Sequence, residues 1–244
     1  MTAPARPPAE NVAAQPLRPP RVSDDLAYVL PMLAFLVFVW VGGSWKSLYV
    51  PAYVARALTV PILLAVLWRH YTKVRWNGWW LGVIVGVFGV FQWVLMQKWI
   101  EAHLGHLPTL RPPKPEDVFN PWRDIHAGPA AVWAFIAVRV AGAALVVPVM
   151  EELFWRDYLW RQILSPNNFK LAAIGEWAWA PFLGTSVFFC TVHGHWWPTA
   201  IVWGLMVGAL LAYTKSIGAC IVAHAVTNAL LAAYVLKTHD WTFW

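Results

Sequence analysis

The sequence predicts an all-α protein, a polytopic transmembrane helical bundle of about seven or eight helices. Hydrophobic residues make up 59% of the chain and charged residues only 12%, about half the charged share of a typical soluble domain. Several apolar runs approach the roughly 20 residues that a helix needs to cross a bilayer. Many of the 19 Trp residues stand beside the ends of these runs, as they do in the aromatic belts of membrane proteins.

The chain divides into an N-terminal tail and one transmembrane domain. Residues 1–24 are rich in Pro and Ala and lack the apolar core of a signal peptide, so we predict a flexible tail. Residues 25–244 show neither an internal repeat nor a second domain. The net charge of +6 favours contact with anionic lipid over nucleic-acid binding, because no basic cluster is long enough for the latter.

Seven apolar segments are expected to cross or enter the membrane, and the third has a face of small residues, Gly82 and Gly86, for close helix packing. The loop at 97–129 is predicted to lie outside the membrane, and 157–170 to be amphipathic or interfacial. The distribution of Lys and Arg in the loops favours a cytoplasmic N-terminus. The predicted segments are 26–41, 50–68, 79–96, 130–152, 178–193, 198–213 and 217–236.

Two carboxylates follow directly on the fourth apolar segment. An ionisable side chain inside a bilayer costs about 2.5–3.5 kcal/mol on insertion scales, so it is a functional-site hypothesis by default. Glu152 and Arg156 are one helical turn apart, which allows an ion pair, and Glu151 then points about 100° away. Glu151 can serve as a general base on water, or the pair can simply mark a helix end among lipid headgroups. Arg139, the remaining charge in this segment, is expected to pair with a carboxylate or to lie near an interface.

Two further apolar segments carry polar groups. His193 ends the fifth segment, whereas His195 stands beside two Trp residues and is expected at an interface. His224 and Asn228 are four residues apart and therefore share one helix face, where they can donate to an oxyanion or join helices. Cys190 lies three residues before His193, so a thiol nucleophile is an alternative to a small buried apolar residue.

The predicted passes leave one geometric difficulty. Simple antiparallel helices set Glu151 and His193 near opposite membrane surfaces, where they cannot act together. We therefore expect either that Pro148 breaks the fourth helix or that residues 155–164 dip into the membrane, since irregular backbone is tolerated beside a protein cavity.

Three short motifs occur in order: Glu151-Glu-Leu-Phe-Trp-Arg156, Phe189-Cys-Thr-Val-His193 and His224-Ala-Val-Thr-Asn228. They resemble the EExxxR, FxxxH and HxxxN motifs of the CPBP intramembrane proteases, the family of CAAX prenyl endopeptidases and bacteriocin-processing relatives. The resemblance covers residues 130–236, the expected catalytic core. In its length and Trp content the chain also looks like the CAAX protease-related proteins that accompany exosortase systems.

The resemblance implies a bundle around a conical cavity open to the cytoplasm, in a bacterial plasma membrane. It implies that Glu151 and His193 activate a water, and that His224 and Asn228 stabilise the oxyanion. If a divalent metal such as zinc takes part, a metalloprotease results, and Glu151, His193 and His224 are the candidate ligands. The motif positions expected to shape the site are Glu152 and Arg156.

The expected function is an intramembrane endopeptidase acting on a membrane-anchored protein or peptide, with a prenylated CAAX-like substrate as one class. The sequence has neither the HExxH motif of zinc proteases nor the GxSxG context of a serine hydrolase. The alternatives are a non-catalytic membrane scaffold or immunity-type factor of the same fold, and a His-ligated redox or transport protein.

Overall fold

The structure, a computed structural model, describes residues 22–244, and these form helices and connecting segments without a β-strand. The predicted all-α polytopic bundle is confirmed, with six helices long and apolar enough to cross a membrane in this part of the chain. The predicted tail lies outside the described residues as far as residue 21, and residues 22–24 already belong to the first helix. The long helices are α1 (Val22–Ser44), α2 (Tyr49–Val66), α3 (Trp79–Leu104), a fourth span that begins with α5 (Pro129–Ala141), α9 (Trp197–Thr214) and α10 (Ile217–Thr238).

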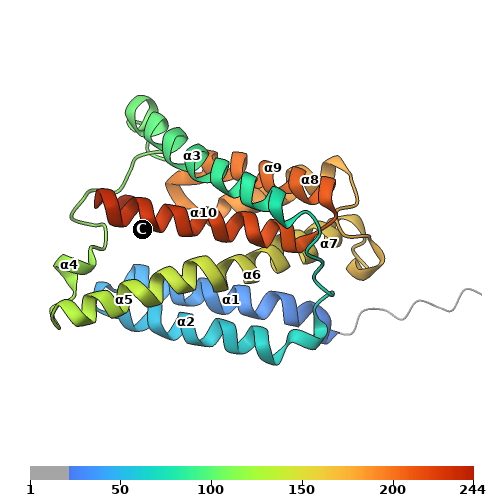
Figure 1. Ribbon diagram of the computed structural model, residues 1–244, viewed down its shortest axis with the longest axis horizontal. Coiled ribbons are helices and arrows are strands. Elements are labelled where there is room, and N and C mark those ends of the chain that lie inside the picture. Colours follow the sequence, from blue (N-terminus) through green and yellow to red (C-terminus); the bar gives the residue numbers. More distant parts are fainter. Residues whose placement is uncertain (1–21) are drawn as a thin grey trace, which may run out of the picture.

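The helices form two groups that meet along α10 (Figure 1). In one group α1 and α2 pack as an antiparallel pair against α5. In the other, α3 packs against α9 and α10, and the short α8 (Trp179–Thr191) packs against α9. The α6 segment (Val147–Glu152) of the fourth span contacts α10, so the Glu pair lies where the two groups meet.

The predicted small-residue face of α3 is confirmed, and it lies against α10. A Cβ atom built on Gly82 would lie 2.4 Å from the carbonyl oxygen of Ala219, and one on Gly86 would lie 2.6 Å from that of Ala223. The Thr227 hydroxyl of α10 lies 2.9 Å from the carbonyl oxygen of Gly86. The close approach of the two backbones is therefore possible only because these positions carry no side chain.

The fourth span was predicted to end at the Glu pair, and this was wrong. Helical backbone runs from Pro129 to Leu164, 36 residues and about 54 Å, well beyond the roughly 30 Å of the hydrocarbon core. Pro148 does not break it; instead, wide π-helical turns occur at η3 (Gly142–Val146) and η4 (Leu153–Leu159), on either side of α6. The extra length sets Glu151 deep in the bundle and removes the geometric difficulty that the sequence left open.

Residues 157–170 were predicted to be amphipathic or interfacial, and the first part of that stretch continues the helix with its charges buried. Asp157 and Arg161 are buried and form an ion pair one helical turn apart. The Tyr28 hydroxyl donates to the second Asp157 oxygen at 2.7 Å, and the Arg161 Nε donates to the carbonyl of Ala172 at 2.8 Å. Because both charges are paired inside the protein, α7 (Trp160–Leu164) continues the span instead of leaving it.

Helices α8 and α9 form a hairpin in which α8 is the shorter helix. The 13 residues of α8 cover about 20 Å, so this predicted fifth pass is too short to cross the membrane alone. Conversely, α3 extends past its predicted end into the expected loop, because Gln97 is fully buried and accepts a hydrogen bond from Thr199 of α9. The remaining helices are α4 (Pro121–Asp124) and the short 3₁₀ turns, including η7 (Trp241–Phe243).

The contact between α3 and α10 yields a stability prediction. We expect Gly86→Ala to destabilise the bundle by about 1–3 kcal/mol, because the new methyl group forces the two helices apart. The measurement is thermal unfolding in detergent. The matched control is Gly43→Ala, whose Cβ would meet nothing within 4 Å, and equal losses in the two variants would contradict the prediction.

Candidate active site

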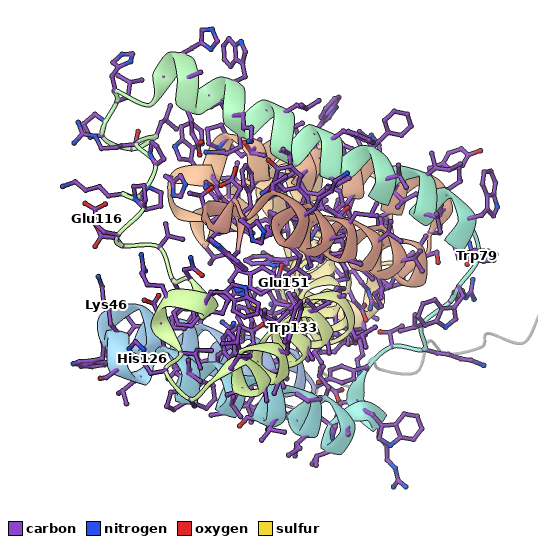
Figure 2. All side chains as sticks on the ribbon, turned by 60° about the vertical axis from the view of Figure 1, so that its left-hand side comes forward. Lys46, Trp79, Glu116, His126, Trp133 and Glu151 are labelled. Atoms are coloured by element: carbon purple, nitrogen blue, oxygen red, sulfur yellow. The ribbon has the colours of Figure 1, made fainter. Side chains whose placement is uncertain are left out.

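A cavity of about 170 Å³ lies where the two helix groups meet, and all four sequence-predicted catalytic residues line it. Glu151 comes from α6, His193 from the turn after α8, and His224 and Asn228 from α10. Figure 2 shows Glu151 in the middle of the bundle. The other lining residues are mostly apolar or aromatic: Trp93, Val147, Phe189, Trp196, Trp203, Thr227 and Leu231.

Glu151 is buried and incompletely bonded. Glu151 is 6% exposed, and its Oε2 atom is buried without a hydrogen-bond partner. A buried polar atom left unpaired costs about 1–3 kcal/mol, and more if it is charged. Such an atom in a cavity wall is therefore available to a water or a substrate.

The last turn of α8 orients His193. The Nδ1 atom lies 2.7 Å from the carbonyl oxygen of Phe189, which is one of the carbonyls that a helix end leaves without an intrahelical partner. A carbonyl can only accept, so Nδ1 carries the proton, and Nε2 of the neutral ring is an acceptor. The four-residue spacing of Phe189 and His193 thus has a direct structural reason.

Glu152 connects three elements through one oxygen. Its Oε1 accepts from Arg156 at 3.2 Å, which confirms the predicted ion pair, and from Nδ1 of His224 at 2.8 Å. The three residues are 0%, 1% and 5% exposed, respectively, and the Arg156 guanidinium lies over the Phe189 ring at 4.9 Å. The sequence did not predict the bond to His224, because 72 residues separate it from Glu152 and no local spacing reveals it.

Asn228 has a structural partner as well as a place in the cavity wall. Its Nδ2 donates to the carbonyl of Ala143 at 2.8 Å. In a π-helical turn that carbonyl is the acceptor for the N–H of residue 148, and Pro148 has none. Asn228 therefore supplies from α10 the donor that the fourth span lacks, and this role was not predicted from the HxxxN spacing.

The candidate metal ligands do not form a metal-binding set. Over residues 22–244, no three His, Cys, Asp or Glu side chains are grouped so that they could hold a metal ion. Glu151, His193 and His224 line one cavity, but their arrangement does not fit zinc or another divalent ion. Cys190 and Cys220 are free and buried, and neither lines the cavity.

The fold and the site define a class of protein: an integral membrane protein with a Glu–His cavity enclosed by helices. Residues 131–230 match the family model described as type II CAAX prenyl endopeptidase Rce1-like. This region holds all three motifs, and it is similar to the CAAX protease family that the model describes. No curated protein and no solved structure matches the chain.

The shared carboxylate of Glu152 yields a second stability prediction. We expect Arg156→Met to destabilise the protein by about 3–5 kcal/mol, because it leaves a buried carboxylate without its charged partner. Chemical or thermal unfolding in detergent measures the loss. Lys46→Met is the control, since it breaks an ion pair with Asp117 whose side chains are 79% and 57% exposed, and it is expected to have little effect. Similar stabilities for the two variants would argue against the prediction.

The bond between Asn228 and Ala143 can be tested through Pro148. We expect Asn228→Ala to cost about 1–3 kcal/mol in the natural background, because a buried carbonyl loses its donor. In a Pro148→Ala background the restored N–H can serve that carbonyl, so the cost should fall. Unfolding of the four proteins of this double-mutant cycle measures the coupling, and an unchanged cost would refute the structural role.

Proposed function

We propose that this protein is an intramembrane endopeptidase. It hydrolyses a peptide bond near the terminus of a membrane-anchored protein or peptide, with prenylated CAAX-like chains as one substrate class. The observation that supports this most is the common cavity of Glu151, His193, His224 and Asn228 inside a membrane bundle. The match of residues 131–230 to a protease family model also supports it.

In the proposed first step, Glu151 and His193 activate a water. Glu151 accepts one proton of the water on its unpaired Oε2, and Nε2 of His193 accepts the hydrogen bond of the other proton. The water oxygen adds to the carbonyl carbon of the scissile bond, whose electron pair moves onto the carbonyl oxygen. When the C–N bond breaks, the proton held by Glu151 moves to the leaving amine.

In the same step His224 and Asn228 stabilise the oxyanion. The Asn228 amide has two N–H groups, and the bond to Ala143 uses one of them. His224 donates through Nε2 when both ring nitrogens carry protons, and the Glu152 carboxylate on Nδ1 offsets the charge of that form. Donors directed at the developing charge in a site with little water are the largest contribution to many such reactions.

The aromatic walls of the cavity strengthen these contacts by limiting water. The ring of Trp93 lies 5.7 Å from that of His193, and the ring of Trp203 lies 6.0 Å from that of His224. Hydrogen bonds to charges are stronger where bulk water is excluded. The tryptophans therefore strengthen the hydrogen bonds that the few polar groups of the wall make to charges that develop in the reaction.

The proposed setting is a bacterial plasma membrane with the N-terminus in the cytoplasm. Basic residues near the start of α1 support this orientation, since Lys170 pairs with Asp24, and Lys73, Arg75 and Lys215 line one cleft beside it. Two more hollows, lined by Arg139 and by Lys46, continue from the catalytic cavity toward the opposite end of the bundle. If the N-terminus is cytoplasmic, an opening of the cavity at that opposite end does not face the cytoplasm.

The reaction is tested by replacing the water-activating residues. We expect Glu151→Gln and His193→Ala to lower the cleavage rate by at least about 10²–10⁴-fold without unfolding the bundle, because each removes a proton acceptor. The assay uses purified protein in vesicles with a mixed-sequence library of lipid-anchored peptides, and mass spectrometry identifies the fragments.

A matched control stands close by in the sequence. His195 is in the same turn as His193 but does not line the cavity, and we expect His195→Ala to keep full activity. Cleavage retained by either site variant would refute the assignment, and activity that survives loss of all four cavity residues would favour the scaffold alternative.

A further inference from the structure

A second cavity adjoins the catalytic one. It has a volume of about 130 Å³, and it shares Asn228 and Leu231 with the catalytic cavity as common wall. On its other side it shares Trp244 with a cleft of about 940 Å³ at the end of the bundle. Lys46 and His126, which line this cleft, lie at the opposite end of the molecule from Trp79 in Figure 2. The three hollows therefore form a row that leads from one end of the bundle to Glu151.

Arg139 of α5 lines the middle cavity and has no acidic partner among the described residues. Of the two alternatives predicted for Arg139, a carboxylate partner or a place near an interface, the first is therefore not found. Its guanidinium donates to the Tyr49 hydroxyl and lies over the rings of Tyr53 and Trp244, at 5.0 and 4.8 Å. Two other cations near this end differ, because Lys46 pairs with Asp117 and Arg123 with Asp124. The hydrogen bond from Arg123 also lowers the pKa of the Asp124 carboxyl, so that pair stays charged.

The guanidinium of Arg139 keeps most of its donors for a ligand. A guanidinium has five N–H donors in one plane, and Tyr49 takes one of them. The aromatic rings occupy its faces and leave the edge, where two parallel N–H groups match a carboxylate. An unpaired cation within a membrane-spanning helix is costly, and a cavity beside it indicates a ligand that completes the pair.

One helix face connects this cation to the catalytic base. Arg139 and Ala143 line the middle cavity, and Val147 and Glu151, continuing the same four-residue spacing, line the catalytic one. At 1.5 Å per residue, Arg139 and Glu151 are about 18 Å apart along the helix. An extended peptide covers about 3.3–3.6 Å per residue, so about five residues bridge this distance.

We propose that Arg139 binds the free C-terminal carboxylate of the substrate, about five residues beyond the scissile bond. This rests on the proposed endopeptidase function and assigns to Arg139 the recognition of a substrate C-terminus that enters the row of cavities along α5 and α6. The peptide lies with its scissile carbonyl at Glu151 and its anionic end at Arg139. The enzyme then releases a short C-terminal fragment.

Arg56 provides an internal comparison. Its guanidinium lies over the rings of Tyr53 and Phe35, 4.2 and 4.6 Å from their centres. Like Arg139, it has no carboxylate partner among residues 22–244. It lines a crevice of only about 10 Å³, which is too small for a carboxylate, and Val147 is the one wall residue that this crevice shares with the catalytic cavity. Arg56 is therefore the matched control for Arg139.

The test compares a lipid-anchored peptide that ends five residues after the cleaved bond, as the free acid and as the C-terminal amide, in phosphatidylcholine vesicles. We expect the natural enzyme to prefer the acid in kcat/KM by about 10–100-fold, the range of one hydrogen-bonded charge pair. Arg139→Gln should lower cleavage of the acid to the level of the amide and leave the amide unchanged. Arg56→Gln should keep the preference. Peptides with two to eight residues after the bond should show an optimum near five.

Binding separates this proposal from the proposed reaction. The acid peptide should bind Glu151→Gln protein more tightly than the amide does by fluorescence anisotropy, and Arg139→Gln should remove the difference even if no cleavage is ever observed. Equal binding of acid and amide, or a preference that persists without Arg139, overturns the proposal. A third result also overturns the proposal: Arg139→Gln changes only the effect of added phosphatidylglycerol on the protein, because Arg139 then binds a lipid phosphate.

Discussion

One buried carboxylate oxygen, Oε1 of Glu152, holds the site together. It accepts from Arg156 of the same helix and from His224 of α10, so it joins the two helix groups where they meet. A buried charge is stable only with partners in good geometry, which means that α6 and α10 have little freedom to slide. Since Glu151 is the next residue on the helix, the same constraint directs its side chain about 100° away and into the cavity.

The fourth span keeps its backbone bonded although its helix is irregular. Inside a bilayer each carbonyl needs a donor from the protein, and Pro148 removes one next to a wide turn. Asn228 supplies the replacement from the neighbouring helix while lining the catalytic cavity. Its structural and chemical contributions are therefore joined in one amide, and a single replacement of Asn228 cannot separate them.

Local spacing was enough to predict part of this arrangement. The apolar runs predicted the spans, and Gly82 and Gly86 predicted the face of α3 that packs closely against another helix. The four-residue separation of Glu152 and Arg156 predicted their ion pair. The end of the fourth span was missed because Asp157 and Arg161 look solvent-exposed in sequence. They are buried through Tyr28, 129 residues from Asp157, and no periodicity reports a contact at that distance. The row of cavities depends on such distant contacts throughout, so it was not predicted either.

The charges inside the fourth span then fall into two kinds. Arg156 and Arg161 each have a carboxylate one turn away, and these pairs fasten helices. Glu151 and Arg139 have no partner of opposite charge within the described residues, yet both line cavities on one face of one helix. Unpaired charges at such positions weaken the bundle, so a structural role does not account for them. A peptide whose reacting carbonyl lies beside the water bound by Glu151 and whose anionic end lies at Arg139 uses both groups at once.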